Sequence, residues 1–476
     1  MHQAKLDLGF FNLVAGRRLP TDNRMMVIDP STGLELATAP DIDRSGLDAA
    51  AAAARTAFPE WSMLTWADRR ARIAEVIAVL RDHVPELSAL LVLEGGRSPA
   101  IAEWEVRWVT DLFAPLLLEQ RLSEQEWHQE GMGRVIQRHV PRGVVGAISP
   151  WNLPFMLSFV KALPALLVGN TVVLKPSPYT PLTVLRAADR ISAALPAGVL
   201  NVISGGDELG PWMTSHPDLE QISFTGSTQT GRRVLGAAAA TLKHVTLELG
   251  GNDPGIVLPG TDPLPIVERL FQSMFMLSGQ TCIGLKRLYV HEADYDALTR
   301  ALVAHARTQH VGAAFDPSAA LGPIQNLPQL LRLEAAWAEI QRSGARVLYR
   351  GDNPRDSRGL FFPITLLDDP PSDAPYVREE HFGPLRSVMK YRTLEEAFLK
   401  ANDSAYGLGA SVWGQDPLFL DTAARQLEAG TVWINQHMLT HPSVPFGGHK
   451  DSGIGVMYGI EGLRDLCDLR VIAARY

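Results

Sequence analysis

The sequence GVVGAI at residues 143–148 is a short apolar run that ends in Ser149-Pro150. It predicts a buried strand, and the apolar spacing of residues 155–167 predicts a helix directly after it. The same alternation continues to Gly251, where the apolar runs are closed by glycine or proline. Further strands are predicted over 170–174, 199–203, 222–224 and 244–249, and further helices over 182–195 and 232–242. This order indicates a parallel sheet covered by helices on both faces, the Rossmann-like form of the α/β class.

Polar residues collect where these predicted strands end. Asn152 follows the first strand closely, Lys175 follows the second, and Glu248 lies at the end of the last. Ligands of open parallel sheets bind beyond the carboxyl ends of the strands. We therefore expect a ligand site along this edge of the sheet.

The alternation extends outward in both directions. Before residue 120 we expect a short extended start and then mainly helices, at 45–58, 67–83, 87–93 and 102–118. After Gly251 a second α/β domain is expected, with helices at 266–277 and 294–307 and strands at 287–291, 385–391, 410–413 and 431–435. The polar segment 121–138 lies between the domains. The tail, 466–475, mixes apolar and charged residues and predicts an added edge strand.

The composition narrows the class of protein. Of 476 residues, 46% are hydrophobic and 20% charged, an ordinary globular balance, and the formal net charge of -8 gives no reason to expect a nucleic-acid partner. The two cysteines, Cys282 and Cys467, cannot form a disulfide framework and fit a reducing cytoplasm. Residues 1–7 lack the apolar core of a signal peptide, and the apolar stretch 163–173 is too short to span a bilayer. We expect a cytoplasmic protein without a membrane partner.

Cys282 and Glu248 are candidates for nucleophile and base. Cys282 has glycines on both sides, Gly279 and Gly284, which favour an approachable backbone, although a lone cysteine is more often a small buried hydrophobe. A catalytic thiol also needs a base. Glu248 ends an apolar strand, where burial would raise the pKa of its carboxyl group toward a value useful for general base catalysis. Taken alone, Glu248 could equally be a buried residue that makes a structural hydrogen bond instead of acting as a base.

The loop around Asn152 is fixed by Pro150, Trp151 and Pro154. A fixed amide is a good hydrogen-bond donor to an oxyanion. The alternative, a turn-forming asparagine before a helix, is the commoner case.

Gly226 and Ser227 join a predicted strand to a helix and would present backbone N–H groups to a phosphate. An ordinary tight turn explains them equally well. The spacing from Gly226 to Gly231 resembles a P-loop, but Arg232-Arg233 replaces the required Lys-Ser/Thr, which excludes an NTPase. Histidines without ligand spacing argue against a metal site, and the absence of a G-x-S-x-G motif argues against a serine hydrolase.

Seven motifs together resemble the aldehyde dehydrogenase superfamily. They occur in the family's order, the similarity extends from about Phe11 to Leu469, and Glu248 and Cys282 are separated by 34 residues as in the family. The motifs are Pro150-Trp151-Asn152, Lys175-Pro176-Ser177, Phe224-Thr225-Gly226-Ser227, Leu247-Glu248-Leu249-Gly250-Gly251, Gly279-Gln280-Thr281-Cys282, Glu379-Glu380-His381-Phe382-Gly383-Pro384 and Pro445-Phe446-Gly447-Gly448.

The resemblance implies a two-step oxidation of an aldehyde to a carboxylic acid. Cys282 would attack the aldehyde as a thiolate, and the Asn152 amide with the Cys282 backbone N–H would hold the oxyanion. Hydride transfer to the nicotinamide would leave a thioester, which water activated by Glu248 would hydrolyse. A soft nucleophile, an oxyanion site and a separate base are what such acyl chemistry requires.

The resemblance also implies NAD or NADP as the cofactor. Lys175 would bind the adenosine ribose, Ser227 the pyrophosphate and Glu380 the nicotinamide ribose, with Phe382 beside it. Gly206 and Gly210 would lie near the adenine. The full cofactor set is Ile148, Trp151, Lys175, Ser177, Pro178, Gly206, Gly210, Phe224, Gly226, Ser227, Leu249, Glu380 and Phe382.

By position in the family, the substrate tunnel would be mostly apolar, which favours a hydrophobic aldehyde. The family implies a cofactor-binding domain of residues 1–120 and 140–249 and a catalytic domain of residues 250–459. A small β element for oligomerisation, 121–139 and 460–476, would support a homodimer or homotetramer. The tunnel residues are Leu153, Leu157, Val160, Thr281, Ile283 and Phe446.

Three positions depart from the family pattern. Pro178 stands where many NAD⁺-preferring members carry a glutamate that binds ribose hydroxyls, so repulsion of a 2′-phosphate is reduced and we expect both cofactors to be accepted. Pro178 also removes a hydrogen bond, which would weaken the binding of either. Val456-Met457 replaces a common Arg-Glu, and His381 replaces a common apolar residue.

Three other functions fit the sequence less well. A CoA-acylating dehydrogenase generally lacks the deacylating glutamate, whereas Glu248 is present. A non-catalytic protein of the same fold would not need Cys282, Glu248 and Asn152 together. A thiol esterase would not need Lys175 and Glu380.

Overall fold

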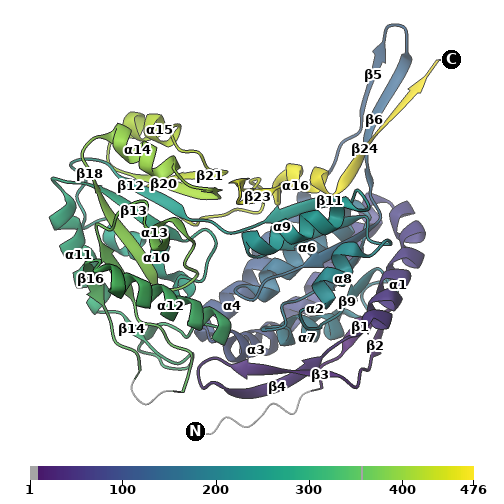
Figure 1. Ribbon diagram of the computed structural model, residues 1–476. Coiled ribbons are helices and arrows are strands. Elements are labelled where there is room, and N and C mark those ends of the chain that lie inside the picture. The colour runs from purple at the N-terminus through teal and green to yellow at the C-terminus, as the bar shows by residue number, and fades with distance from the viewer. Residues whose placement is uncertain (1–8, 355–357, 476) are drawn as a thin grey trace.

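The computed structural model describes residues 9–354 and 358–475. Two α/β lobes lie side by side, and a long β arm projects from the lobe that contains the N-terminal half of the chain (Figure 1). Residues 1–8 of the first predicted domain, residues 355–357 of the second, and Tyr476 lie outside the described residues.

An eight-stranded sheet forms the centre of the first lobe. The five neighbouring strands β9, β8, β7, β10 and β11 run parallel. At the two sides of this group, β1 pairs antiparallel with β9, and β23 pairs antiparallel with β11. In spatial order the strands are β2 (Arg17–Leu19), β1 (Asn12–Val14), β9 (Leu200–Val202), β8 (Thr171–Lys175), β7 (Val144–Ile148), β10 (Gln221–Thr225), β11 (His244–Glu248) and β23 (Gly453–Ile454).

Helices cover both faces of this sheet, and each face has its own apolar cluster. Every residue of β7, β8 and β10 is buried, as expected for parallel strands that are covered on both sides. One face carries α2 (Trp66–Asp82), α3 (Val84–Gly95), α4 (Pro99–Arg107), α5 (Ala114–Glu119), α6 (Pro154–Val168) and α7 (Leu182–Ile191). The other carries α1 (Arg44–Met63), α8 (Leu209–Ser215) and α9 (Thr228–Ala239).

A seven-stranded sheet forms the centre of the second lobe. Six of its strands run parallel, and the edge strand β16 pairs antiparallel with β17. Its strands in order are β16 (Val347–Arg350), β17 (Thr365–Asp368), β18 (Leu385–Tyr391), β13 (Leu285–His291), β12 (Asp253–Val257), β20 (Gly409–Trp413) and β21 (Thr431–Ile434). One face carries α10 (Val267–Phe275) and α11 (Tyr295–Arg307), and the other α12 (Leu327–Ser343), α14 (Leu394–Asn402) and α15 (Pro417–Ala424). A short α13 (Pro375–Arg378) lies between β17 and β18 in the chain.

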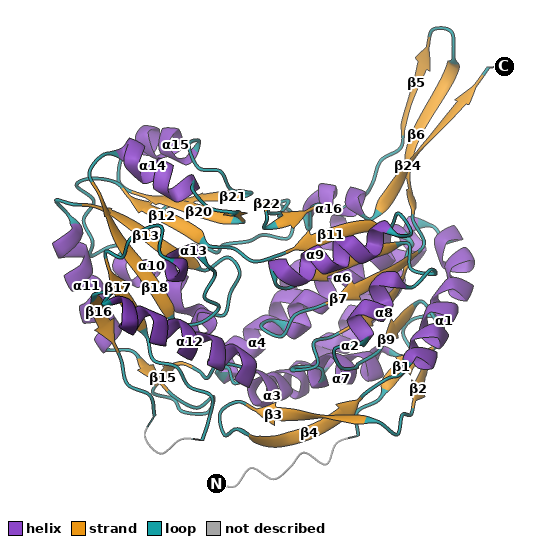
Figure 2. Cartoon of the chain, in the orientation of Figure 1, coloured by secondary structure: helices purple, strands orange, loops and turns teal. Residues whose placement is uncertain are grey.

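The arm is a three-stranded antiparallel sheet in which the end of the chain pairs with a hairpin (Figure 2). Its order is β24 (Cys467–Ala474), β6 (Gly133–Pro141) and β5 (Gln125–Gln129). The helix α16 (Gly459–Asp465) precedes β24. Three small two-stranded sheets complete the fold: β3 (Arg24–Asp29) with β4 (Leu34–Pro40), β14 (His310–Val311) with β15 (Ala319–Leu321), and β19 (Tyr406–Gly407) with β22 (His449–Lys450).

The predicted α/β class and the alternation over residues 143–249 are confirmed, as is the edge strand in the tail. The helix expected at 232–242 begins earlier, because Ser227 caps α9 by accepting a hydrogen bond from the Thr230 backbone N–H. The helix expected at 266–277 ends at Phe275, because Leu277 and Ser278 adopt positive φ angles of 54° and 58°.

Some elements differ from the prediction. The helix expected at 102–118 is divided by a π-helical segment, Trp108–Phe113, between α4 and α5. The extended start is longer than expected and contains β1 to β4, and the polar segment 121–138 contains the hairpin of β5 and most of β6. The domain boundaries at residues 120, 140, 249 and 459 stay a prediction.

Candidate active site

A cleft of about 530 Å³ lies at the carboxyl ends of β7, β10 and β11. β7 and β10 are neighbours in the sheet, with the successive strands β8 and β9 on one side and β11 on the other, so the cleft lies where the strand order reverses. Loops after these strands line one wall, and α12 with the segment after α13 lines the other. The lining includes Trp151, Asn152, Leu157, Gly226, Ser227, Leu249, Cys282, Gln329, Arg332, Glu380 and Phe382.

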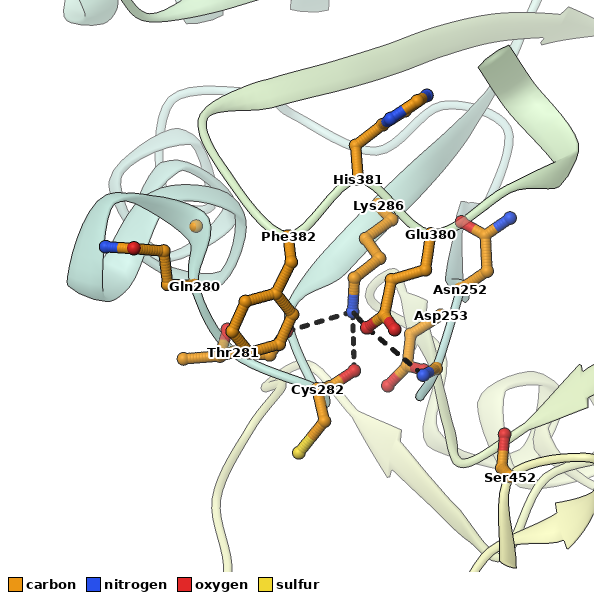
Figure 3. A network of polar contacts seen from close by, with 12 residues as sticks. Asn252, Asp253, Gln280, Thr281, Cys282, Lys286, Glu380, His381, Phe382 and Ser452 are labelled. Atoms are coloured by element: carbon orange, nitrogen blue, oxygen red, sulfur yellow. Dashed lines mark hydrogen bonds and ion pairs between the residues drawn. The ribbon is translucent and has the colours of Figure 1, made fainter. Parts of the chain in front are cut away.

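Cys282 reaches this cleft from a tight turn between α10 and β13. Gly279 has φ 71°, and a Cβ atom there would lie 2.3 Å from the Gly383 carbonyl oxygen, so the turn requires glycine. Lys286 donates hydrogen bonds to the carbonyl groups of Thr281 (3.0 Å) and Cys282 and forms an ion pair with Glu380 at 3.2 Å. The Cys282 sulfur points away from this ammonium group (Figure 3).

The Cys282 thiol is partly exposed. Burial in the surrounding protein raises the pKa of the Cys282 thiol to about 12, against the lowering effect of the Lys286 ammonium. The thiol is therefore held as a neutral group in the protein alone, and its activation requires a further positive charge or a base at the site.

Glu248 is the last residue of β11 and is only 5% exposed. Within the described residues, neither carboxylate oxygen of Glu248 has a hydrogen-bond partner. Burial raises the pKa of the Glu248 carboxyl to about 8, although the ammonium of Lys161 lowers it. A buried carboxylate without a partner is costly, so such a group is expected to take up a proton or a water molecule.

Lys161 is buried in α6 and was not predicted as a site residue. Its ammonium donates to the Ser223 hydroxyl at 3.3 Å and contacts the Met457 sulfur at 3.7 Å. Burial lowers the pKa of Lys161 to about 8, and the Glu248 carboxylate opposes that change. The available signal in the sequence was a single charged residue in the apolar run 155–167.

Asn152 is held against the cysteine turn, because its Nδ2 atom donates to the Gln280 carbonyl at 3.0 Å. The loop is stabilised from behind by Glu105, which accepts hydrogen bonds from the backbone N–H groups of Phe155 and Met156. Glu105 therefore caps the start of α6, where no local side chain does so, and Arg97 neutralises it in a buried ion pair.

The predicted cofactor residues fall into two groups. Trp151, Gly226, Ser227, Leu249, Glu380 and Phe382 line the cleft, whereas Ile148, Lys175, Ser177, Pro178, Gly206, Gly210 and Phe224 do not. Phe382 meets Trp151 edge to face, with ring centroids 5.2 Å apart. Glu380 accepts a hydrogen bond from the Gly251 N–H at 3.2 Å.

Lys175, at the end of β8, is a buried cation with one long contact, 3.4 Å from Nζ to the Pro176 carbonyl. Burial lowers the pKa of Lys175 to about 8, and Asp207 and Asp41 oppose that change. Asp41 also accepts a hydrogen bond from the Gly206 N–H at 2.9 Å, which brings the loops after β4 and β9 together. Within residues 9–354 and 358–475 the Lys175 ammonium has only this contact, so its other donors are available to a ligand.

Of the predicted substrate residues, only Leu157 lines the cleft. Leu153, Thr281, Ile283 and Phe446 are not part of its lining, and Val160 lines a separate small cavity beside Lys161. The Thr281 hydroxyl lies 3.9 Å from the sulfur of Met438, a residue without a recognisable signal in the sequence.

His381 departs from the family pattern without an explanation in the sequence, and the structure shows a structural role for it. Its Nε2 atom lies 2.9 Å from the Tyr376 carbonyl, and burial lowers the pKa of His381 to about 4. The ring is neutral at physiological pH and ties the segment after α13 to that helix. Within residues 9–354 and 358–475, no group of three or more His, Cys, Asp or Glu side chains could hold a metal ion.

Comparison with known proteins shows the family. The family model of the aldehyde dehydrogenase family matches residues 18–472. An aldehyde dehydrogenase of Enchytraeus buchholzi is 35% identical, with 98% of this chain and 94% of that protein covered. Phenylacetaldehyde dehydrogenase of Pseudomonas fluorescens is 34% identical, with 96% and 93% covered.

Solved structures of aldehyde dehydrogenases also match the chain. Lactaldehyde dehydrogenase from Escherichia coli has a TM-score of 0.94 at 32% identity, covering 98% of this chain and 99% of its own. Betaine aldehyde dehydrogenase from Staphylococcus aureus, solved in complex with NAD⁺, has a TM-score of 0.94 at 29% identity, covering 98% and 95%. The chain belongs to the aldehyde dehydrogenase family and is an enzyme that oxidises aldehydes. No helix among the described residues is long and apolar enough to cross a membrane.

The two cysteines should differ in reactivity. Burial raises the pKa of both thiols to about 12, so the difference must come from access, because Cys282 lines the cleft and Cys467 is buried. A thiol reagent should therefore label Cys282 at least about tenfold faster than Cys467. Mass spectrometry of the timed reaction measures both rates, and Cys282→Ser serves as the control. Equal rates would show that the cleft does not admit reagent to the sulfur.

Proposed function

We propose that the enzyme oxidises a hydrophobic aldehyde with NAD⁺ or NADP⁺ through a thioester on Cys282. The observation that carries this proposal is the arrangement of three groups. A partly exposed thiol lies on the wall of the cleft, an amide is fixed against the same turn, and a buried carboxylate at the neighbouring strand end has no protein partner. Cys282 and Asn152 line the cleft itself, whereas Glu248 is not part of the lining and directly precedes Leu249, which is.

In the proposed first step a base at the site takes the proton of the Cys282 thiol, and the sulfur bonds to the aldehyde carbon. The Asn152 amide and the Cys282 backbone N–H stabilise the oxygen that becomes negative. Lys286 holds the Thr281 and Cys282 carbonyl groups, which keeps that N–H in a fixed direction. A nicotinamide dinucleotide held by Lys175, Ser227 and Glu380 would supply the hydride acceptor for the aldehyde carbon, and a thioester would remain on Cys282.

In the second step Glu248 takes a proton from water as that water attacks the thioester carbon. Release of the acid returns the sulfur to its starting form. The raised pKa of Glu248 makes it a better proton acceptor than an exposed carboxylate.

The chemistry of the predicted cofactor residues is suited to binding a dinucleotide. Lys175 offers buried ammonium donors without good protein acceptors, and Ser227 opens α9, whose N-terminal N–H groups favour a pyrophosphate. Glu380, held by Lys286 and the Gly251 N–H, presents a carboxylate that would bind ribose hydroxyls. Trp151 and Phe382 supply apolar walls.

The proposal also includes the class of substrate and the oligomeric state. Leu157, the one predicted tunnel residue in the lining of the cleft, favours an apolar aldehyde. The edge strand β24 exposes Leu469, Val471 and Ile472, which supports association into a homodimer or homotetramer through the arm. The free cysteines and the net charge of -8 support a cytoplasmic protein without nucleic-acid partners.

The central test compares two variants in a panel of aldehydes. Cys282→Ser should lower turnover by more than about a thousandfold and leave cofactor binding within twofold, because only the nucleophile is lost. Glu248→Gln should produce about one reduced nicotinamide per site and then stall as the thioester. Absorbance of the reduced cofactor and intact mass measure these outcomes.

Cys467→Ser is the matched control and should keep full turnover. Full activity of Cys282→Ser would contradict the proposal, and so would continuous turnover of Glu248→Gln. Acyl-CoA formed on addition of CoA would instead identify CoA as the acyl acceptor.

The pH dependence of deacylation follows from Glu248. Its pKa is raised to about 8, so the protonated, inactive form prevails below that pH and the base form above it. Deacylation should therefore increase about tenfold per pH unit below 8 and level off above. Steady-state hydrolysis of p-nitrophenyl acetate, limited by deacylation, measures this without titrating the free thiol. A flat profile would contradict the assignment, and Glu248→Gln should show one.

Cofactor preference tests the region around Lys175. Because Pro178 supplies no carboxylate, we expect both NAD⁺ and NADP⁺ to be used, with less than a hundredfold preference in kcat/KM. The carboxylate of Asp207 acts on Lys175 and opposes a 2′-phosphate. Asp207→Asn should therefore raise the NADP⁺/NAD⁺ ratio of kcat/KM by about threefold, whereas Asp352→Asn, in the other lobe, should leave it unchanged. A stronger NAD⁺ preference in the wild type would contradict the expectation.

A further inference from the structure

Tyr458 has a backbone conformation that is rare for any residue with a side chain. It directly precedes α16 and has φ 62° and ψ 165°, a region populated almost only by glycine. The neighbouring backbone holds it there, because Phe446 and Met457 exchange hydrogen bonds of 2.8 and 2.7 Å, and Gly459 donates to Pro442 at 2.9 Å. Strain of this kind persists where the surroundings impose it, and it is concentrated at functional sites.

The ring of Tyr458 is fixed by an aromatic cluster. Its centroid lies 6.0 Å from Trp108, 5.9 Å from Phe113 and 6.2 Å from Phe446. Trp108 and Phe113 come from the π-helical segment of the first lobe, and Phe446 comes from the connection between β21 and β22. Two segments that are distant in the sequence therefore determine where the hydroxyl group lies.

Tyr458 lies close to the proposed reacting groups. Its ring borders a small cavity of about 30 Å³, which Lys161, Ser223 and Met457 also line. That volume admits one or two water molecules. Thr246 also lines this cavity and lies two residues before Glu248 on the same face of β11, which places the cavity beside Glu248. Burial raises the pKa of the Tyr458 phenol, and the charge of Glu248 acts in the same direction, so the phenol keeps its proton.

A donor and an acceptor in this region both lack protein partners. Within the described residues, the Tyr458 hydroxyl makes no hydrogen bond to protein and is not sealed from solvent, and both Glu248 oxygens are buried without a partner. The two groups interact electrostatically without a direct hydrogen bond. A water molecule between them would accept from the phenol and donate to the carboxylate, which satisfies both.

We propose that Tyr458 is a further catalytic residue, whose phenol donates a hydrogen bond to the water that hydrolyses the thioester. The inference rests on the proposed function of Cys282 and Glu248. The water oxygen forms a bond to the thioester carbon, and one water proton passes to Glu248. The carbon–sulfur bond then breaks, its electron pair returns to the Cys282 sulfur, Glu248 passes its proton to that sulfur, and the carboxylic acid is released. Tyr458 orients the water and neither gains nor loses a proton.

The test is Tyr458→Phe, which removes one oxygen atom and keeps the aromatic cluster. The probe is p-nitrophenyl acetate without cofactor, because its initial burst reports acylation of Cys282 and its steady state reports deacylation. We expect the burst rate to stay within twofold and the deacylation rate to fall about ten- to hundredfold. With an aldehyde and NAD⁺, about one equivalent of reduced nicotinamide should appear rapidly before a slow phase.

Two further measurements separate catalysis from structure. Hydroxylamine, a nucleophile that needs little activation, should restore fast release of the acyl group in Tyr458→Phe. Thermal unfolding should stay within about 2 °C of the wild type. Tyr349→Phe, a hydroxyl deletion on β16 in the second lobe, is the matched control and should deacylate normally.

Deacylation of Tyr458→Phe within twofold of the wild type would overturn the inference. A rise in KM with equal losses of acylation and deacylation would also overturn it, because that pattern assigns the phenol to substrate binding. An ester burst that survives in Cys282→Ser would instead contradict the proposed function itself, so the two failures are distinguishable.

Discussion

The ammonium group of Lys286 connects the parts of the site that come from different regions of the chain. It binds two carbonyl groups of the cysteine turn and pairs with Glu380, which in turn accepts from the Gly251 N–H. A buried cation is stable only when such partners surround it. The cysteine turn, the start of β12 and the segment after α13 are therefore held together by one charge.

The two carboxylates near Cys282 show how environment separates roles. Both are buried and have raised pKa values, but Glu380 has a lysine and a backbone N–H as partners, whereas Glu248 has no hydrogen-bond partner among the described residues. A satisfied carboxylate serves to hold and orient, while an unsatisfied one remains available for proton transfer. The difference arises from β13, which places Lys286 beside one acid and not the other.

Much of the fold could be predicted because its signals are local. The apolar runs of β7, β8 and β10 are continuous, since both faces of each strand are covered, and glycine or proline closes most of them. The strands of residues 9–40 and the hairpin of β5 and β6 gave no such signal. β5 is exposed along its whole length, so its pairing with β6 rather than its composition makes it a strand.

The site was predictable only in part, for a similar reason. Cys282, Glu248 and Asn152 lie in short motifs at strand ends, where the chemistry of the residue and its position coincide. Lys161 and Lys286 lie within buried elements, and their importance depends on groups that are distant in the sequence. Tyr458 depends on a backbone angle and on three aromatic rings from other segments, which no local pattern records.

The pairing of β24 with β6 has a consequence for biosynthesis. Strand β6 (residues 133–141) can pair with β24 only after residues 467–474 have been synthesised. In the same way, β11 gains its neighbour β23 only after residues 453–454 have been synthesised. A nascent chain leaves the ribosome with both strand edges open, and these long-range pairings form last. Shielding of these edges by a chaperone, or rapid synthesis of residues 453–474, would thus favour correctly assembled molecules.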